Sequence, residues 1–207
     1  MIGFYNYSVI LTYIGLGASI FGMTQVFAGN FTWAFFCLMI SGTCDMFDGK
    51  IARAMKNRTD QEKVFGIQID SLCDLICFGM LPAMIGYAMS ENKKLGGVAS
   101  VLFVLGAVIR LGYFNVMEQE RQQITTEHRE YYQGLPVTTV AIILPAVYIV
   151  GSLLNRPNFP TAFSIIMIIV SFLFVLDFKV KKPGNLGVCL MTAFGILVVV
   201  ALLSVTM

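Results

Sequence analysis

Charged residues are scarce in this chain of 207 residues. Asp, Glu, Lys and Arg together make up 13% of it, whereas apolar residues make up 57%, and the mean hydropathy is +0.78. A water-soluble domain normally carries about 25% charged residues, so the composition argues against a soluble enzyme and favours a membrane protein. The 14 basic and 12 acidic residues nearly balance, so we expect no nucleic-acid partner.

Early basic residues and paired cysteines are also missing. No Lys or Arg precedes Lys50, so the N-terminus lacks the basic region of a cleavable signal peptide, and we expect its first apolar run to stay in the mature protein. No two cysteines have the Cys-x-x-Cys spacing of a zinc or redox site. All five cysteines fall inside apolar runs, which predicts small core residues: Cys37, Cys44, Cys73, Cys77 and Cys189.

Long apolar runs dominate what the sequence does contain. A helix needs about 20 mostly apolar residues to cross the hydrocarbon layer of a bilayer, and runs near that length alternate with short polar breaks, such as the tight turn predicted at Gly29 and Asn30. No internal repeat is visible. We expect a single membrane-embedded domain over residues 1–207, an all-α polytopic bundle of about seven transmembrane helices, within a range of six to eight. The predicted spans are residues 9–28, 31–52, 65–90, 96–117, 136–154, 160–177 and 186–205.

The distribution of positive charge predicts how these helices are oriented. Lys and Arg in short loops resist translocation, so the more basic side faces the cytoplasm. The loops after the second, fourth and sixth predicted spans hold ten Lys and Arg residues, whereas the loops on the other side hold three. We therefore expect an integral protein of the cell (plasma) membrane with those three loops, and the N-terminus, in the cytoplasm.

Four aspartates lie within or at the end of apolar runs, namely Asp45, Asp48, Asp70 and Asp74. Placing a charge inside a membrane helix costs about 3 kcal/mol on insertion scales, so these residues need a compensating partner. The first pair is spaced i, i+3 and the second i, i+4, so each pair projects from one face of its helix. Both pairs lie at the predicted cytoplasmic ends of consecutive helices, so we expect the two acidic faces to meet.

Facing carboxylates without a nearby His or Cys ligand favour a hard cation, which means Mg²⁺ or Mn²⁺, with Ca²⁺ as another ion that could occupy the site. Two ions about 4 Å apart would neutralise all four groups, and such pairs hold phosphoryl groups for in-line displacement. Gly49 and Gly66 leave room for a bulky ligand, and Arg53 carries a guanidinium suited to phosphate. A cation transporter is the alternative from another class, although transporters usually place such acids near the bilayer midplane.

These residues resemble a known signature. The pattern Asp45-x2-Asp48-Gly49-x2-Ala52-Arg53, followed by Gly66-x3-Asp70-x3-Asp74, is similar to that of the CDP-alcohol phosphatidyltransferases, with all eight fixed positions present. The 12 residues between Arg53 and Gly66 form a longer interval than is usual in that family. The resemblance implies a homodimeric enzyme that acts on CDP-diacylglycerol.

The resemblance also implies roles for the matching residues. All four aspartates would be ligands of two divalent ions, and Asp74 would act as the catalytic general base. The nucleotide-binding residues implied by the family are Asp45, Gly49, Ala52, Arg53, Gly66 and Asp70.

A narrower resemblance concerns the acceptor alcohol. The segment Asp70-Ser71-Leu72-Cys73-Asp74 is similar to the phosphatidylserine synthase branch of the family, as are Phe78-Gly79, Pro82, the Arg110–Asn115 stretch and Gly134-Leu135-Pro136. Gly112 and Tyr113 stand where that branch has Ala and Arg. L-Serine is therefore the expected acceptor, and glycerol phosphate, an inositol compound and choline are alternatives.

Arg110 and Asn115 are the candidates for binding the alcohol or a lipid phosphate. Arg110 lies inside a predicted span, where a fixed positive charge could pair with a carboxylate or phosphate. The alternative is a side chain that extends to the lipid headgroups with its stem among apolar residues. Asn115 could add hydrogen bonds to the same substrate.

Overall fold

The computed structural model describes residues 3–4, 7–55, 59–124, 131–154, 157–181 and 185–206. Within these residues the chain forms seven continuous helical segments, as the all-α prediction requires. They are α1 (Tyr7–Phe27), α2 (Phe31–Ala54), an unbroken rod of α3 (Asp60–Asp74), η1 (Leu75–Met80) and α4 (Leu81–Met89), then α5 (Lys93–Ile124), α6 (Val140–Leu154), α7 (Phe159–Val175) and α8 (Asn185–Thr206). A short 3-10 turn, η2 (Val137–Thr139), leads into α6.

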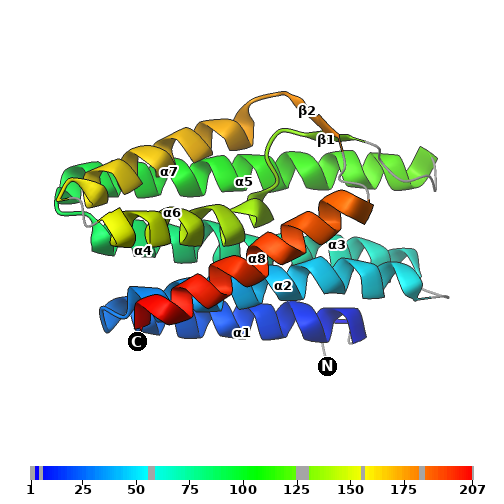
Figure 1. Cartoon of the computed structure of the whole chain (residues 1–207). Helices are drawn as coiled ribbons and strands as arrows, with labels where there is room; N and C mark the ends of the chain where they lie inside the picture. Colours follow the sequence, from blue (N-terminus) through cyan, green and yellow to red (C-terminus); the bar gives the residue numbers. More distant parts are fainter. Residues whose placement is uncertain are drawn as a thin grey trace.

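The helices lie roughly lengthwise in one bundle (Figure 1). The hairpin of α1 and α2 forms one side, α5 and α7 form the opposite side, and α4 and α6 lie between them. Helix α8 crosses obliquely over α2 and α6. The predicted turn between α1 and α2 is confirmed, since Gly29 adopts φ +76°, which glycine tolerates best.

Four helical segments are long and apolar enough to cross a membrane: Val9–Phe27, Asp60–Met89, Lys93–Glu120 and Val137–Leu154. The predicted helices are thus present, but seven spans are not confirmed. Helix α2 is not among the four, since the charged residues of its second half lower its hydropathy. Helix α7 has 17 residues, and the apolar stretch described in α8, Ala193–Ser204, is also short. The protein is an integral membrane protein by these spans.

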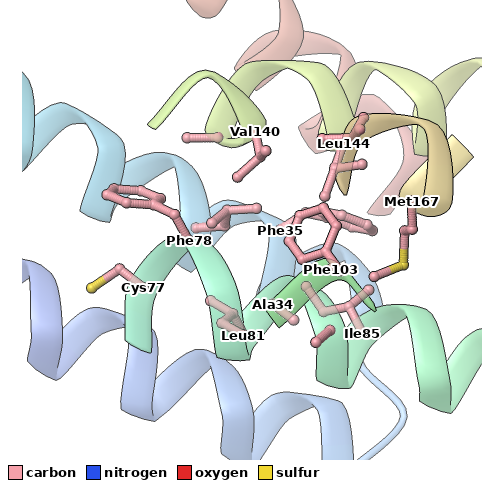
Figure 2. Packing of buried hydrophobic residues seen from close by; sticks show 14 of the residues in the cluster. Ala34, Phe35, Cys77, Phe78, Leu81, Ile85, Phe103, Val140, Leu144 and Met167 are labelled. Atoms are coloured by element: carbon pink, nitrogen blue, oxygen red, sulfur yellow. The ribbon is translucent and has the colours of Figure 1, made fainter. Parts of the chain in front are cut away.

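Large apolar side chains from α2, η1, α4, α5, α6 and α7 meet in the centre of the bundle (Figure 2). Phe35 of α2 lies against Tyr148 of α6, with ring centroids 4.7 Å apart. Phe78 of η1 and Leu81 of α4 are almost fully buried beside them. Lipid tails are as apolar as these side chains, so close van der Waals packing, rather than removal from water, holds α2 against the α3–η1–α4 rod.

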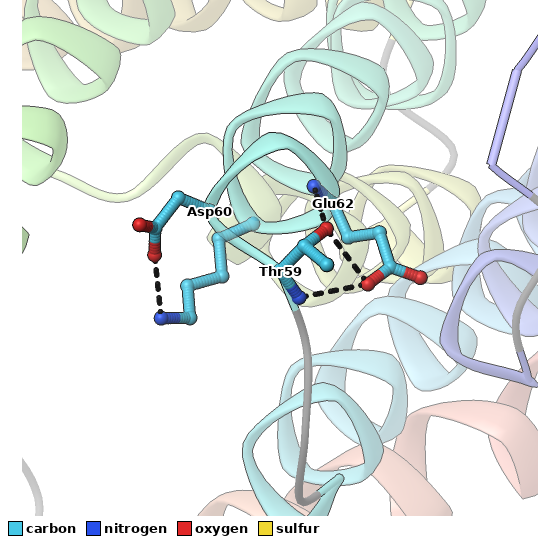
Figure 3. Close-up of polar contacts among 4 residues, drawn as sticks. Thr59, Asp60 and Glu62 are labelled. Atoms are coloured by element: carbon cyan, nitrogen blue, oxygen red, sulfur yellow. Dashed lines mark hydrogen bonds and ion pairs between the residues drawn. The ribbon is translucent and has the colours of Figure 1, made fainter.

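A capping box defines where α3 begins (Figure 3). The Glu62 backbone N–H donates to Thr59 Oγ1 at 3.3 Å, and the Thr59 N–H donates to Glu62 Oε2 at 2.8 Å. Such a cap stabilises a helix by about 1 kcal/mol. Because α3 starts at Asp60, residues 60–65 of the long interval between Arg53 and Gly66 belong to α3.

A two-stranded antiparallel ladder was not predicted. Strand β1 (Tyr131–Gln133) pairs with β2 (Lys179–Lys181), with Tyr132 opposite Val180. The ladder joins the segment after α5 to the segment after α7, at the end of the bundle where α2 ends and α3 begins (Figure 1). Strands of three residues carry little periodic signal, which is why the hydropathy pattern did not indicate them.

Candidate active site

Three of the predicted metal ligands converge between α2 and α3. Asp45, Asp70 and Asp74 each offer a carboxylate oxygen, and these oxygens all lie within 4.8 Å of one another. Asp45 and Asp70 are partly buried, and Asp74 has 9% of its surface exposed. The i, i+4 spacing puts the α3 pair on one face, and the α2–α3 connection of only five residues, 55–59, brings that face to Asp45.

Asp48 lies one turn beyond Asp45 and is not part of that group of three. It is 5% exposed and its carboxylate turns to α1, where Thr12 Oγ1 donates to Asp48 Oδ2 at 2.7 Å. Sequence reasoning missed Thr12. A hydroxyl in an apolar run was the only available signal, and such residues commonly bond their own helix backbone instead.

The donor set of the group suits a hard divalent cation. Its ligand atoms are carboxylate oxygens, which Mg²⁺, Mn²⁺ and Ca²⁺ prefer, and it contains no His or Cys. Three carboxylates held this close inside a helical bundle repel one another. The group of Asp45, Asp70 and Asp74 could therefore hold a metal ion that offsets this repulsion.

The glycines of the signature flank the acidic group. Gly49 follows Asp48 directly in α2, and Gly66 lies one turn before Asp70 in α3, each partly buried. Ala52 and Arg53 continue α2 by one further turn, and their side chains lie outside the described residues. The backbone thus places the signature positions of α2 and α3 along two neighbouring helices.

Helical geometry changes directly after Asp74. The six residues of η1 form a π-helix before α4 continues the rod. Pro82, near the start of α4, has no N–H to donate to a carbonyl in the preceding turn. A π-helical turn widens the helix and often occurs at functional sites, and here it sets off the acidic face of α3 from the apolar segment that enters the core.

Asn115 lies against α3 beside the acidic group. Ser71 Oγ donates to Asn115 Oδ1 at 2.6 Å, and Asn115 Nδ2 donates to Gln68 Oε1 at 3.5 Å. Ser71 immediately follows Asp70 in the chain. Asn115 therefore connects α5 to the helix that carries two of the three converging carboxylates, and its partners Ser71 and Gln68 were not identified from the sequence.

Arg110 is buried on another side of α5, with 8% of its surface exposed. A Cβ atom built on Gly134 would lie 3.4 Å from Arg110 Nη1, 3.0 Å from the Leu176 carbonyl oxygen and 3.4 Å from that of Phe174. The guanidinium thus sits near the carboxyl end of α7, where the helix dipole favours a positive charge. Arg110 is thus enclosed by protein, whereas the alternative for this residue was a side chain that extends to the lipid headgroups.

Comparison with protein families places these residues in context. A family model described as CDP-alcohol phosphatidyltransferase matches residues 5–173, which include α1, α2, α3 and the whole acidic group. The chain belongs to this family. The resemblance of the signature to this family is thereby confirmed.

Individual relatives are serine-dependent enzymes by name. The chain is 34% identical over 129 residues to the CDP-diacylglycerol–serine O-phosphatidyltransferase of Saccharomyces cerevisiae, covering 61% of this chain and 45% of that protein. It is 32% identical over 133 residues to the enzyme of the same name from Helicobacter pylori strain 26695, covering 61% and 52%. The archaetidylserine synthase of Methanothermobacter thermautotrophicus is 28% identical over 160 residues, covering 77% and 62%. The chain spans about half the length of the first two.

Proposed function

We propose that this transferase moves the phosphatidyl group of CDP-diacylglycerol to the hydroxyl of L-serine, producing phosphatidylserine and CMP. The observation that carries the proposal is the convergence of Asp45, Asp70 and Asp74 in a chain of this family. Serine as the acceptor is supported by the names of the three relatives, since two name CDP-diacylglycerol and serine and the third names archaetidylserine. An ether-linked archaeal donor is a second candidate, favoured by the likeness to the archaetidylserine synthase.

The acidic residues would hold the cofactor and move the proton. Asp45, Asp48, Asp70 and Asp74 are the proposed ligands of two divalent ions, Mg²⁺ or Mn²⁺, which when bound would stabilise charge on the phosphate oxygens. Asp74 accepts the proton of the serine hydroxyl as its oxygen forms a bond to the phosphorus of the phosphatidyl group. The bond from that phosphorus to CMP breaks, and CMP leaves with the electron pair.

Other signature residues would bind the substrates. Gly49, Ala52 and Gly66 would accommodate the CDP moiety, and Arg53 would pair with its phosphates. Asp45 and Asp70 are proposed to contact the nucleotide as well.

Arg110 and Asn115 are proposed to bind the serine carboxylate or the lipid phosphate. Asn115 already lies beside α3 through Ser71, which supports its assignment more directly than that of Arg110.

The setting of the site is also part of the proposal. The lipid donor stays in the membrane and serine arrives from water, so the acidic group must lie where membrane and cytoplasm meet. The excess of Lys and Arg in the loops on that side supports this orientation in the cell membrane. We further propose a single catalytic domain over residues 1–207 and a homodimer, as in the family.

Product analysis tests the acceptor. The purified protein is incubated with CDP-diacylglycerol, Mn²⁺ and one alcohol at a time, and the lipid products are separated by thin-layer chromatography while CMP is measured. We expect phosphatidylserine and equimolar CMP with serine, and neither with glycerol phosphate, inositol or choline. A parallel reaction with the archaeal ether-linked donor distinguishes the second candidate. Lipid formed from another alcohol, with none from serine, would refute the proposed acceptor.

A further inference from the structure

Helix α1 carries none of the signature aspartates, yet it contacts one of them, Asp48. Thr12 Oγ1 donates to Asp48 Oδ2 at 2.7 Å across the α1–α2 interface. Asp48 is 5% exposed, so its carboxylate is enclosed mainly by protein. The hydroxyl of Thr12 thus contacts a proposed ligand from a helix that the motif does not include.

Close packing fixes the position of α1 against α2. A Cβ atom on Gly15 would lie 3.2 Å from Cys44 Cβ, so the two helices approach closely there. Ser41 Oγ donates to the Gly15 carbonyl oxygen at 2.7 Å, and the hydroxyls of Ser19 and Ser41 are 2.7 Å apart. Ser19 and Ser41 are both almost fully buried.

These contacts share one antiparallel register. Thr12, Gly15 and Ser19 follow one face of α1, at spacings of three and four residues. Their partners on α2 descend in matching steps, from Asp48 through Cys44 to Ser41. Sliding α1 by one turn would break the buried serine contacts, so the register itself holds the hydroxyl of Thr12 at Asp48.

We propose that Thr12 is a positioning residue that orients the Asp48 carboxylate for the divalent cation; this inference rests on the proposed function. An ionised carboxylate has about four lone-pair sites on its two oxygens, so a hydrogen bond from Thr12 is compatible with binding a cation. Hydrogen bonds to a ligating carboxylate restrict its rotation and orient it. Removing such a bond typically costs about 10- to 100-fold in metal affinity.

The test measures Mn²⁺ binding to the purified, detergent-solubilised protein by electron paramagnetic resonance, without substrate. Valine has the shape of threonine without the hydroxyl, so Thr12→Val should raise the Kd for Mn²⁺ by about 10- to 100-fold. Thr12→Ser keeps the hydroxyl, so its Kd for Mn²⁺ should stay well below the roughly 10-fold rise that is the least expected for Thr12→Val. Thermal unfolding of each variant checks that α1 remains docked.

Thr24→Val is the matched control. Thr24 lies on the same helix about 18 Å from Thr12, and its exposed hydroxyl donates only to the Phe21 carbonyl oxygen among the contacts described. We expect this variant to bind Mn²⁺ normally. Unchanged binding in Thr12→Val, an equal loss in Thr24→Val, or a loss in Thr12→Ser as large as in Thr12→Val would each overturn the role of Thr12.

Serine-dependent CMP release by the unmodified protein separates the two proposals. If Thr12→Val binds Mn²⁺ normally while the unmodified protein releases CMP with serine, the positioning role fails and the function stands. If Thr12→Val loses Mn²⁺ binding but the unmodified protein forms no phosphatidylserine from serine, the positioning role holds and the proposed acceptor fails.

Discussion

Replacing Asp74 with Asn should reduce the rate of CMP release by about 10²- to 10⁴-fold, the usual contribution of a general base. Asp74 lies at the end of α3 with only 9% of its surface exposed, and its oxygens lie close to those of Asp45 and Asp70. An amide has nearly the same shape but cannot accept the proton of the acceptor hydroxyl. Asp74, unlike Asp45 and Asp70, is not among the residues proposed to contact the nucleotide, so binding of CDP should change much less than turnover.

The measurement compares kcat for CMP release with the Kd for CDP in the same preparation. Asp60→Asn is the matched control, because Asp60 begins the same helix with its side chain 97% exposed and pairs with Lys63 at 3.0 Å. We expect normal turnover in Asp60→Asn. Turnover in Asp74→Asn equal to that of the control would contradict the assignment of Asp74 as base.

Replacing Asp45 with Asn should have a different signature, with both Mn²⁺ and CDP bound at least about 100-fold more weakly. The change removes a charged ligand atom from the group itself. The loss of Mn²⁺ affinity should therefore be at least as large as that caused by removing a residue that only hydrogen-bonds to a metal ligand. Asp45 is the only member of the converging group that α2 contributes within the described residues. Its loss therefore reduces the converging group to the α3 pair, Asp70 and Asp74.

Titration calorimetry with Mn²⁺ alone and then with CDP measures both effects. Asp177→Asn, an exposed aspartate after α7, serves as control and should leave both affinities unchanged. The proposal for Asp45 fails if the variant binds Mn²⁺ and CDP as tightly as the control does.

The sequence predicted the helices and the meeting of α2 and α3 because both depend on local spacing. Apolar runs of suitable length indicate helices, and the i, i+4 spacing of Asp70 and Asp74 places them on one face whatever the surroundings. The predicted span at α2 is not among the helices that are long and apolar enough to cross a membrane. The same charged residues that build the site make that helix less apolar than its neighbours.

Contacts between distant segments could not be predicted in this way. Spacing places Asp48 near the face of Asp45, but the partner at 2.7 Å is Thr12, which precedes it by 36 residues. The register of α1 on α2 decides that contact. Likewise, the position of Arg110 near the end of α7 depends on how α5 and α7 pack and on where the turn at Gly134 lies against them. Neither of these arrangements can be inferred from the spacing of residues within one segment.

The most direct test of the central claim is to locate Mn²⁺ by anomalous X-ray diffraction in crystals of the protein grown with Mn²⁺ and CDP. We expect anomalous density bonded to carboxylate oxygens of Asp45, Asp70 and Asp74 and adjoining the phosphates of CDP. Density confined to other residues, or CDP bound with no Mn²⁺ at these three aspartates, would contradict the claim that α2 and α3 form a divalent-cation site for a CDP-linked substrate.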